Sequence, residues 1–134
     1  MLKVYLCGPI NGCTDDECQT WRDWFQSQPS EDFYPRDVAW IDPMERGYRG
    51  KEAEDYREIV ELDKRDVRES DCLVVMYTQP SVGTSMEIFL AWSLGKPVLV
   101  INESNKPVSP WLRYHATAMV RTKELAMQKL KEWF

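Results

Sequence analysis

The chain has 134 residues, a length typical of one domain, and we expect a single domain over residues 1–134. Its net charge of −5 argues against a surface that binds nucleic-acid polymers, although an acidic chain can hold one nucleotide in a pocket. No apolar run approaches the roughly 20 residues that cross a bilayer, and the N-terminal residues lack a signal-peptide layout. We therefore expect a cytoplasmic protein without a membrane partner.

Apolar periodicity and turn residues predict a regular alternation of strands and helices. In chain order we expect a strand at 2–7, a helix at 14–28, a strand at 38–41, a helix at 51–69, a strand at 71–77, a helix at 85–94, a strand at 97–101, a short helix at 111–117, a strand at 118–121 and a helix at 122–134. Loops are expected between Pro29 and Pro35 and at 44–50. This alternation is typical of an α/β protein with a doubly wound parallel sheet.

The sequence lacks the motifs of several familiar cofactor-binding and catalytic sites. There is no G-x-G-x-x-G fingerprint, no P-loop and no G-x-S-x-G elbow. The four cysteines have no C-x-x-C spacing and there is one histidine, His115, so we expect reduced thiols and no metal site. A Cys–His pair is conceivable, but the thiols are expected to be buried. Carboxylates are therefore the expected reactive groups.

Two carboxylates stand out by their position. Glu87 is expected in the first turn of a helix that follows a buried strand, at the sheet edge where open α/β proteins bind ligands. Asp63 is expected in the second half of the long helix. Two acids that flank one bond are the usual arrangement for cleaving a glycosidic link. The structural alternatives are that Glu87 only complements the helix dipole and that Asp63 is a solvated surface charge.

Five segments, taken together and in order, resemble the nucleoside 2-deoxyribosyltransferase family. They are Tyr5-Leu6-Cys7-Gly8-Pro9-Ile10-Asn11-Gly12, the stretch from Asp63 to Asp71-Cys72-Leu73-Val74-Val75, Ser81-Val82-Gly83-Thr84-Ser85-Met86-Glu87-Ile88, Gly95-Lys96-Pro97-Val98-Leu99-Val100 and Ser109-Pro110-Trp111-Leu112. The resemblance implies a flavodoxin-like fold, a five-stranded parallel sheet with helices on both faces. It also implies a homodimer or higher oligomer, because the loop at Ser109 resembles one that reaches a neighbouring subunit's site.

The resemblance further implies a retaining reaction without metal or organic cofactor. Glu87 would attack the anomeric carbon of a 2-deoxyribose, Asp63 would transfer a proton to the departing base, and Tyr5 would orient Glu87. Substrate contacts are expected from Gly8, which lets the backbone approach the sugar or base, and from its neighbours in the same motifs. These neighbours are Pro9, Asn11, Ser81, Gly83 and Ser109. A second base or water would then take the sugar from Glu87.

Ser81 divides the family's two branches. The transferases carry an aspartate there, which meets the 5′-hydroxyl, whereas the nucleotide N-hydrolases carry a serine, which helps to hold a 5′-phosphate. Those hydrolases also use an arginine where this chain has Asn11, so a phosphate would need Arg46, Arg49 or Arg113 instead. Transfer and hydrolysis, nucleoside and 5′-monophosphate, and ribose and 2-deoxyribose therefore all stay open. The alternatives outside this chemistry are a non-catalytic nucleotide-binding module and a purely structural partner protein.

Overall fold

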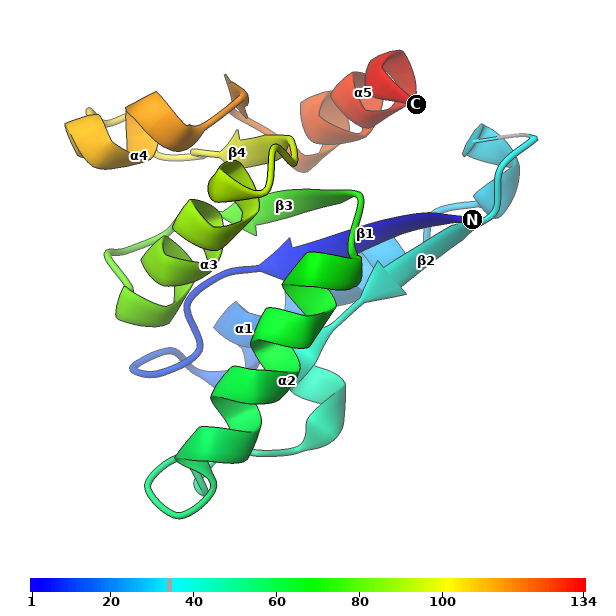
Figure 1. Cartoon of the computed structure of the whole chain (residues 1–134). Helices are drawn as coiled ribbons and strands as arrows, with labels where there is room; N and C mark the ends of the chain where they lie inside the picture. The colour runs from blue at the N-terminus through cyan, green and yellow to red at the C-terminus, as the bar shows by residue number, and fades with distance from the viewer. Residues whose placement is uncertain (34) are drawn as a thin grey trace.

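A computed structural model describes residues 1–33 and 35–134 (Figure 1). The strands are β1 (Leu2–Cys7), β2 (Val38–Ile41), β3 (Cys72–Met76), β4 (Val98–Ile101) and β5 (Ala118–Val120). The α-helices are α1 (Asp15–Gln26), α2 (Tyr56–Glu69), α3 (Val82–Ser93), α4 (Pro110–His115) and α5 (Lys123–Trp133). Two 3-10 turns lie at Ser30–Phe33 and Pro43–Arg46. None of the helices so described is long and apolar enough to cross a membrane.

The five strands form one parallel sheet in the order β2-β1-β3-β4-β5. This is the flavodoxin-like order, and it confirms the predicted fold class. The order reverses between β1 and β3, which pair with Val4 opposite Cys72 and Cys7 opposite Val75. In such sheets the crevice beyond the carboxyl ends of the strands at the reversal point is where ligands bind.

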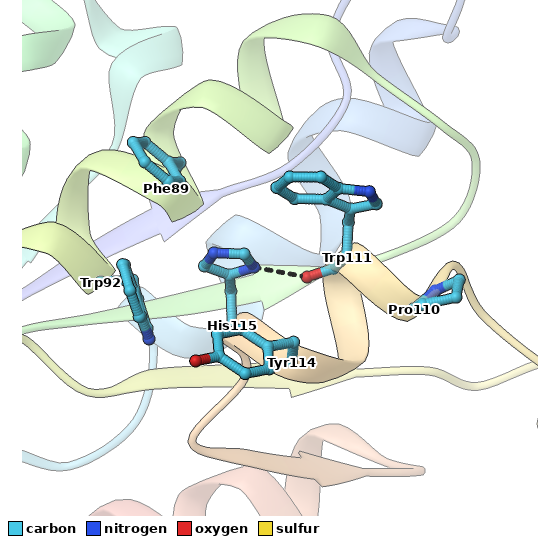
Figure 2. A pocket seen from close by; sticks show the side chains of 6 residues that line it. All are labelled: Phe89, Trp92, Pro110, Trp111, Tyr114 and His115. Atoms are coloured by element: carbon cyan, nitrogen blue, oxygen red, sulfur yellow. Dashed lines mark hydrogen bonds between the residues drawn. The ribbon is translucent and has the colours of Figure 1, made fainter.

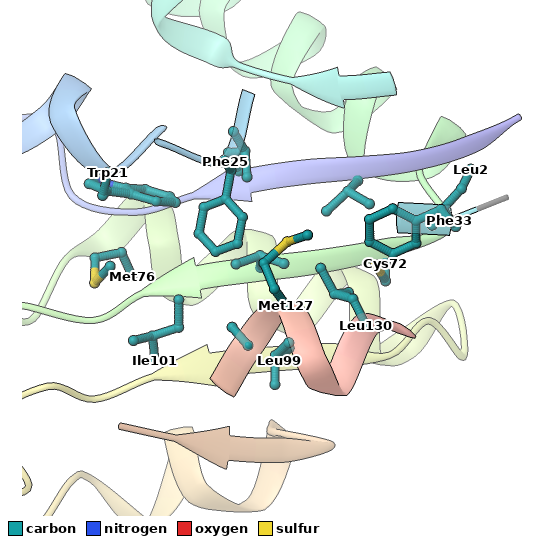
Figure 3. Close-up of a cluster of buried hydrophobic side chains, with 14 residues drawn as sticks. Leu2, Trp21, Phe25, Phe33, Cys72, Met76, Leu99, Ile101, Met127 and Leu130 are labelled. Carbon is teal, nitrogen blue, oxygen red and sulfur yellow. The ribbon is translucent and has the colours of Figure 1, made fainter. Parts of the chain in front are cut away.

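Helices cover both faces of the sheet. Alternate residues of each strand point to opposite sides, and both sets are apolar, so each face packs against helices in its own core. One core joins the strands to Phe25 of α1 and Leu130 of α5 (Figure 3). The other core packs Tyr5 of β1 with Val67 of α2 and Ile88 of α3. In Figure 1, α2 and α3 lie next to each other on this second face. Tyr5, α2 and α3 therefore share one side of the sheet.

Two helix starts differ from the sequence-based expectation. Residues 51–55 form turns, and α2 begins only at Tyr56. α3 begins at Val82 rather than at residue 85, because the Ser81 side chain caps it by accepting a hydrogen bond from the Thr84 amide at 3.3 Å. Glu87 consequently lies in the second turn of α3, and the prediction that it occupies the first turn is wrong.

The expected loops also contain regular turns. Short 3-10 segments occupy Ser30–Phe33 and Pro43–Arg46. The second is capped by Asp42, whose Oδ1 accepts from the Met44 amide at 2.9 Å, and it ends at Gly47 with a φ of 70°. Residue 34 of the predicted loop between Pro29 and Pro35 lies outside the described residues. The turn after β2 carries Arg46 towards α2.

Candidate active site

Glu87 lies on the inward-facing stripe of α3. Thr84, Ile88 and Ala91 of the same helix are all buried, and Glu87 falls between them at helical spacing. The residue as a whole is half-buried, but its Oε2 atom is inaccessible to solvent and has no hydrogen-bond partner among the described residues. A buried polar atom without a partner is costly, so such atoms are rare outside functional sites. The Glu87 carboxyl is therefore the first candidate for chemistry.

The electrostatic surroundings of Glu87 favour its neutral form. Burial raises the pKa of Glu87 to about 8, and the negative charge of Asp63 contributes to the rise. A hydrogen bond with the Tyr5 hydroxyl and the charges of Arg22 and Arg46 act in the opposite direction on this pKa. The helix N-terminus does little to lower this pKa, because Glu87 lies a turn further along the helix, away from the free N–H groups.

Tyr5 meets Glu87 from strand β1, which pairs with the central strand β3. Its side chain is 1% exposed and belongs to the core between the sheet and the α2 and α3 helices. Burial raises the pKa of Tyr5 well above its usual value, and the nearby charge of Glu87 adds to this. The phenol is therefore a neutral hydrogen-bond donor to the Glu87 carboxyl.

Asp63 projects from α2 and is bound by an arginine. Its side chain is 24% exposed, and its Oδ1 accepts a hydrogen bond from Arg46 Nη1 at 2.7 Å. Burial raises the pKa of Asp63, whereas the charge of Arg46 lowers it. Asp63 is thus not a freely solvated helix charge. Because its charge also acts on Glu87, the two carboxyls titrate as a coupled pair.

The loop after β1 begins at the carboxyl end of that strand, at the point where the strand order reverses between β1 and β3. Gly8 has no room for a side chain, since a Cβ there would stand 2.9 Å from Trp21 Cζ2 and 3.2 Å from the Met76 carbonyl oxygen. Packing within the protein therefore requires a glycine at position 8. Pro9 is buried and Asn11 is exposed.

Two arginines hold the same loop in place. Arg22 is fully buried and donates to the carbonyl oxygens of Leu6 at 3.2 Å and Gly8 at 3.1 Å. Arg49 donates to the carbonyl oxygens of Ile10 at 3.0 Å and Cys13 at 2.8 Å. Each satisfies backbone carbonyl oxygens through charge-assisted hydrogen bonds. Arg49 and Arg46 are thus engaged within the chain, while Arg113, the third arginine considered for a phosphate, is exposed on α4.

Ser81 and Ser109 line one cavity of about 370 Å³. The cavity lies between the start of α3 and the start of α4, and its walls include Gln79, Thr84 and Trp111. No carboxylate belongs to these walls in the described part of the chain. Gly83 is not one of the cavity residues, but a Cβ added there would come within 3.9 Å of Glu87 Oε1. A side chain at position 83 would therefore be in van der Waals contact with the Glu87 carboxyl.

A cluster of exposed aromatic side chains adjoins this cavity. Figure 2 shows Phe89 and Trp92 of α3 facing Trp111 and Tyr114 of α4, with His115 between them. These four rings are 42–72% exposed, whereas His115 is buried and its Nδ1–H donates to the Trp111 carbonyl oxygen at 2.6 Å. They surround a second cavity of about 470 Å³. Exposed aromatic patches of this kind are typical of protein interfaces.

The sequence reasoning missed the fully buried Arg22. A signal was present, because Arg22 falls among Cys18, Trp21 and Phe25 at the spacing of a buried helical stripe. Arg46 entered only as a candidate for a phosphate, and no periodicity pointed to its contact with Asp63. The four cysteines are all buried free thiols within residues 1–33 and 35–134. In the same residues, no group of three or more His, Cys, Asp or Glu side chains is placed to hold a metal ion.

The chain thus combines an α/β sheet of flavodoxin-like order with two carboxyls, Glu87 and Asp63, of which one acts electrostatically on the other. A family model described as nucleoside 2-deoxyribosyltransferase matches residues 4–129, so the chain belongs to this family. A curated relative from Mus musculus, 5-hydroxymethyl-dUMP N-hydrolase, is 30% identical over 113 residues, which are 83% of this chain. The chain spans 64% of the length of that relative.

Solved structures share the fold at low sequence identity. A conserved protein from Enterococcus faecalis V583 superposes with a TM-score of 0.72 at 17% identity, over 100% of this chain and 99% of that one. A CMP N-glycosidase from Clostridium botulinum gives a TM-score of 0.57 at 16% identity, over 96% and 97% of the two chains. At this level of identity the likeness shows the fold alone.

Proposed function

We propose that the chain cleaves the N-glycosidic bond of 2′-deoxynucleosides or their 5′-monophosphates through a covalent 2-deoxyribosyl intermediate on Glu87. The observation that carries the proposal is the buried Glu87 carboxyl, which has an unpartnered oxygen and is coupled to Asp63. A binding module has no need for two coupled acids in its site, and a structural role would pair the buried oxygen. Family membership supplies the substrate class.

In this reaction the pair carries one proton. The proton that burial keeps on Glu87 in the free protein passes to Asp63 when the substrate is bound. Glu87 as carboxylate then attacks the anomeric carbon, and the bond to the base breaks with its electron pair going to the base. Asp63 as the acid gives that base its proton. The Tyr5 hydroxyl holds the attacking carboxylate by its hydrogen bond. Water or a second base then displaces the sugar from Glu87, so the anomeric configuration is retained.

We propose further that a 5′-monophosphate is accepted, and that water is the final acceptor. Ser81 and Ser109 offer hydroxyls in one cavity that has no carboxylate in its described walls, beside the N-terminus of α3. An aspartate in place of Ser81 would repel a phosphate. The name of the curated relative, an N-hydrolase of a deoxynucleoside monophosphate, agrees with this branch. A nucleoside 2-deoxyribosyltransferase activity is the alternative.

The exposed aromatic cluster supports an assembly of two or more copies. Trp111 is 72% exposed and Tyr114 is 71% exposed, next to the cavity that contains Ser109. Burying such rings against a second copy would place that copy at the mouth of the cavity, where a shared site becomes feasible. Trp111→Glu should lower the mass measured by light scattering together with the activity. A fully active monomer would contradict the shared site.

The deciding experiment is a base-release assay. The protein is incubated with a deoxynucleoside and with its 5′-monophosphate, with and without a second base, and free base and new nucleoside are separated by chromatography. Glu87→Gln should abolish release, and mass spectrometry should find the deoxyribosyl adduct only on the native chain. Release that persists in Glu87→Gln would exclude Glu87 as the nucleophile. Absence of any release by the native protein would leave the binding module.

A further inference from the structure

Arg46 contacts both acids of a helical pair. Its Nη1 donates to Asp63 at 2.7 Å, and its Nη2 forms an ion pair with Asp66, one turn further along α2. The same Nη2 also lies 3.4 Å from the carbonyl oxygen of Leu62. Asp63 and Asp66 lie three residues apart and therefore project from the same side of the helix.

This arrangement places a single cation between groups that have little water around them. The Arg46 side chain is 18% exposed, that of Asp63 24% and that of Asp66 9%. Arg65 also contacts Asp66, at 3.1 Å, but its side chain is 55% exposed and no contact joins it to Asp63 among the described residues. Among the described residues, Arg46 is consequently the cation that contacts Asp63, while the charge of the buried Arg22 acts on the same carboxyl without a contact.

We infer that Arg46 is a positioning residue that keeps Asp63 able to exist as a carboxylate in the second half of the reaction, an inference that rests on the proposed function. In the first half Asp63 gives its proton to the departing base. In the second half the water oxygen bonds to the anomeric carbon, and the ester bond to Glu87 breaks with its electron pair returning to that carboxylate. The proton that the water loses must then go to Asp63.

Asp63 therefore has to remain unprotonated until water attacks. In a site with little water, a carboxylate without a counter-charge takes up a proton from solvent and can no longer act as a base. Arg46 prevents this through its charge and its hydrogen bond to Oδ1. The other oxygen of Asp63 is left for the base or the water. Asp66 shares the guanidinium and so limits how strongly Arg46 holds Asp63.

The test is Arg46→Gln, which removes the charge but keeps a hydrogen-bond donor. Base release in the first turnover should stay within a few-fold of the native rate, whereas steady turnover should fall about 100-fold, the usual scale of lost general-base catalysis. Rapid-quench measurements should then show a burst of about one base per site, with the sugar adduct accumulating on Glu87. Turnover should recover as the pH rises, because its acidic limb moves up by about one unit.

Arg65→Gln is the matched control, because it removes the same charge beside Asp66 without touching Asp63. It should show no burst and the native pH profile. Equal losses of first-turnover release and steady turnover in Arg46→Gln, with an unmoved pH profile, would overturn the inference. If Arg46→Gln does not fold, Asp66→Asn decides, since removal of its negative charge should move the acidic limb to lower pH and an unmoved limb refutes the role.

A failure of the proposed function can be distinguished from a failure of the role given to Arg46. If the native protein releases no base from any deoxynucleoside or deoxynucleotide, the reaction is wrong whatever Arg46 does. An NMR titration of the Asp63 carboxyl carbon still reports on the arginine in that case. A higher titration midpoint in Arg46→Gln than in Arg65→Gln supports the hold of Arg46 on Asp63, and equal midpoints refute it.

Discussion

The buried Glu87 carboxyl should make the stability of the protein depend on pH in a predictable direction. Its pKa is raised from 4.5 to about 8 in the folded chain. Between these two values the folded state holds a proton that the unfolded state has released, so stability must fall as the pH rises. The stabilising contribution is complete below about pH 4.5 and is lost as the pH passes through about 8.

The magnitude follows from the size of the shift. About 1.4 kcal/mol per pH unit, over the roughly three units between pH 5 and the folded pKa, amounts to about 4 kcal/mol. Glu87→Gln keeps the shape of the side chain but cannot ionise. Compared with the native protein, this variant should gain up to about 4 kcal/mol in unfolding free energy on going from about pH 5 to about pH 9.

Urea unfolding at the two pH values measures this difference, with the linear-extrapolation free energy as the readout. Glu61→Gln is the control, since Glu61 lies exposed on α2 and the chemical change is the same. Subtracting its effect removes the part that any Glu-to-Gln change would cause. A Glu87→Gln effect equal at both pH values would refute the conclusion that Glu87 is neutral in the folded protein.

Three other substitutions test separate parts of the site. Asp63→Asn should slow base release by about 10²–10⁴-fold, and by much less for a leaving group that needs no proton, when the two substrates are compared in one assay. Ser81→Asp should shift kcat/KM from the 5′-monophosphate towards the free nucleoside by about 10- to 100-fold, equivalent to about 1–3 kcal/mol of charge repulsion. Arg22→Met should lower the unfolding free energy by about 3–5 kcal/mol in urea, because three buried carbonyls lose their donor.

The alternation of strands and helices was sufficient to predict the sheet, because the apolar repeat of a strand and that of a helix both show in neighbouring residues of the sequence. Each strand of the central sheet is a short apolar run, and turn residues separate it from its neighbours. The start of α3 was mispredicted for a physical reason. Val82 and Gly83 are poor helix formers, yet the cap at Ser81 and the packing of Ile88 and Ala91 extend the helix over them.

The site was only partly predictable, because its electrostatics depends on contacts between distant segments. Glu87, Asp63 and Tyr5 were identified from motifs, and the structure brings them to one face of the sheet. Their roles stay a prediction until activity is measured. Arg46 and Asp63 are 17 residues apart, and nothing in the local pattern of either segment indicates that they meet. Periodicity reveals which residues are buried, but not which charge a buried acid will face.

The cost of burying Glu87 is informative about its purpose. A surface glutamate would be ionised at neutral pH without any loss of stability, whereas this chain places the carboxyl where burial, together with the charge of Asp63, keeps a proton on it. Water around a carboxylate stabilises its charge more before the attack than after it, when the charge is lost in the ester, and so weakens the nucleophile. In a site without water, the Glu87 carboxylate that Tyr5 orients is stabilised mainly by the positive charge that develops on the sugar in the transition state. The stability lost at alkaline pH and the proposed reactivity of Glu87 thus have one physical cause.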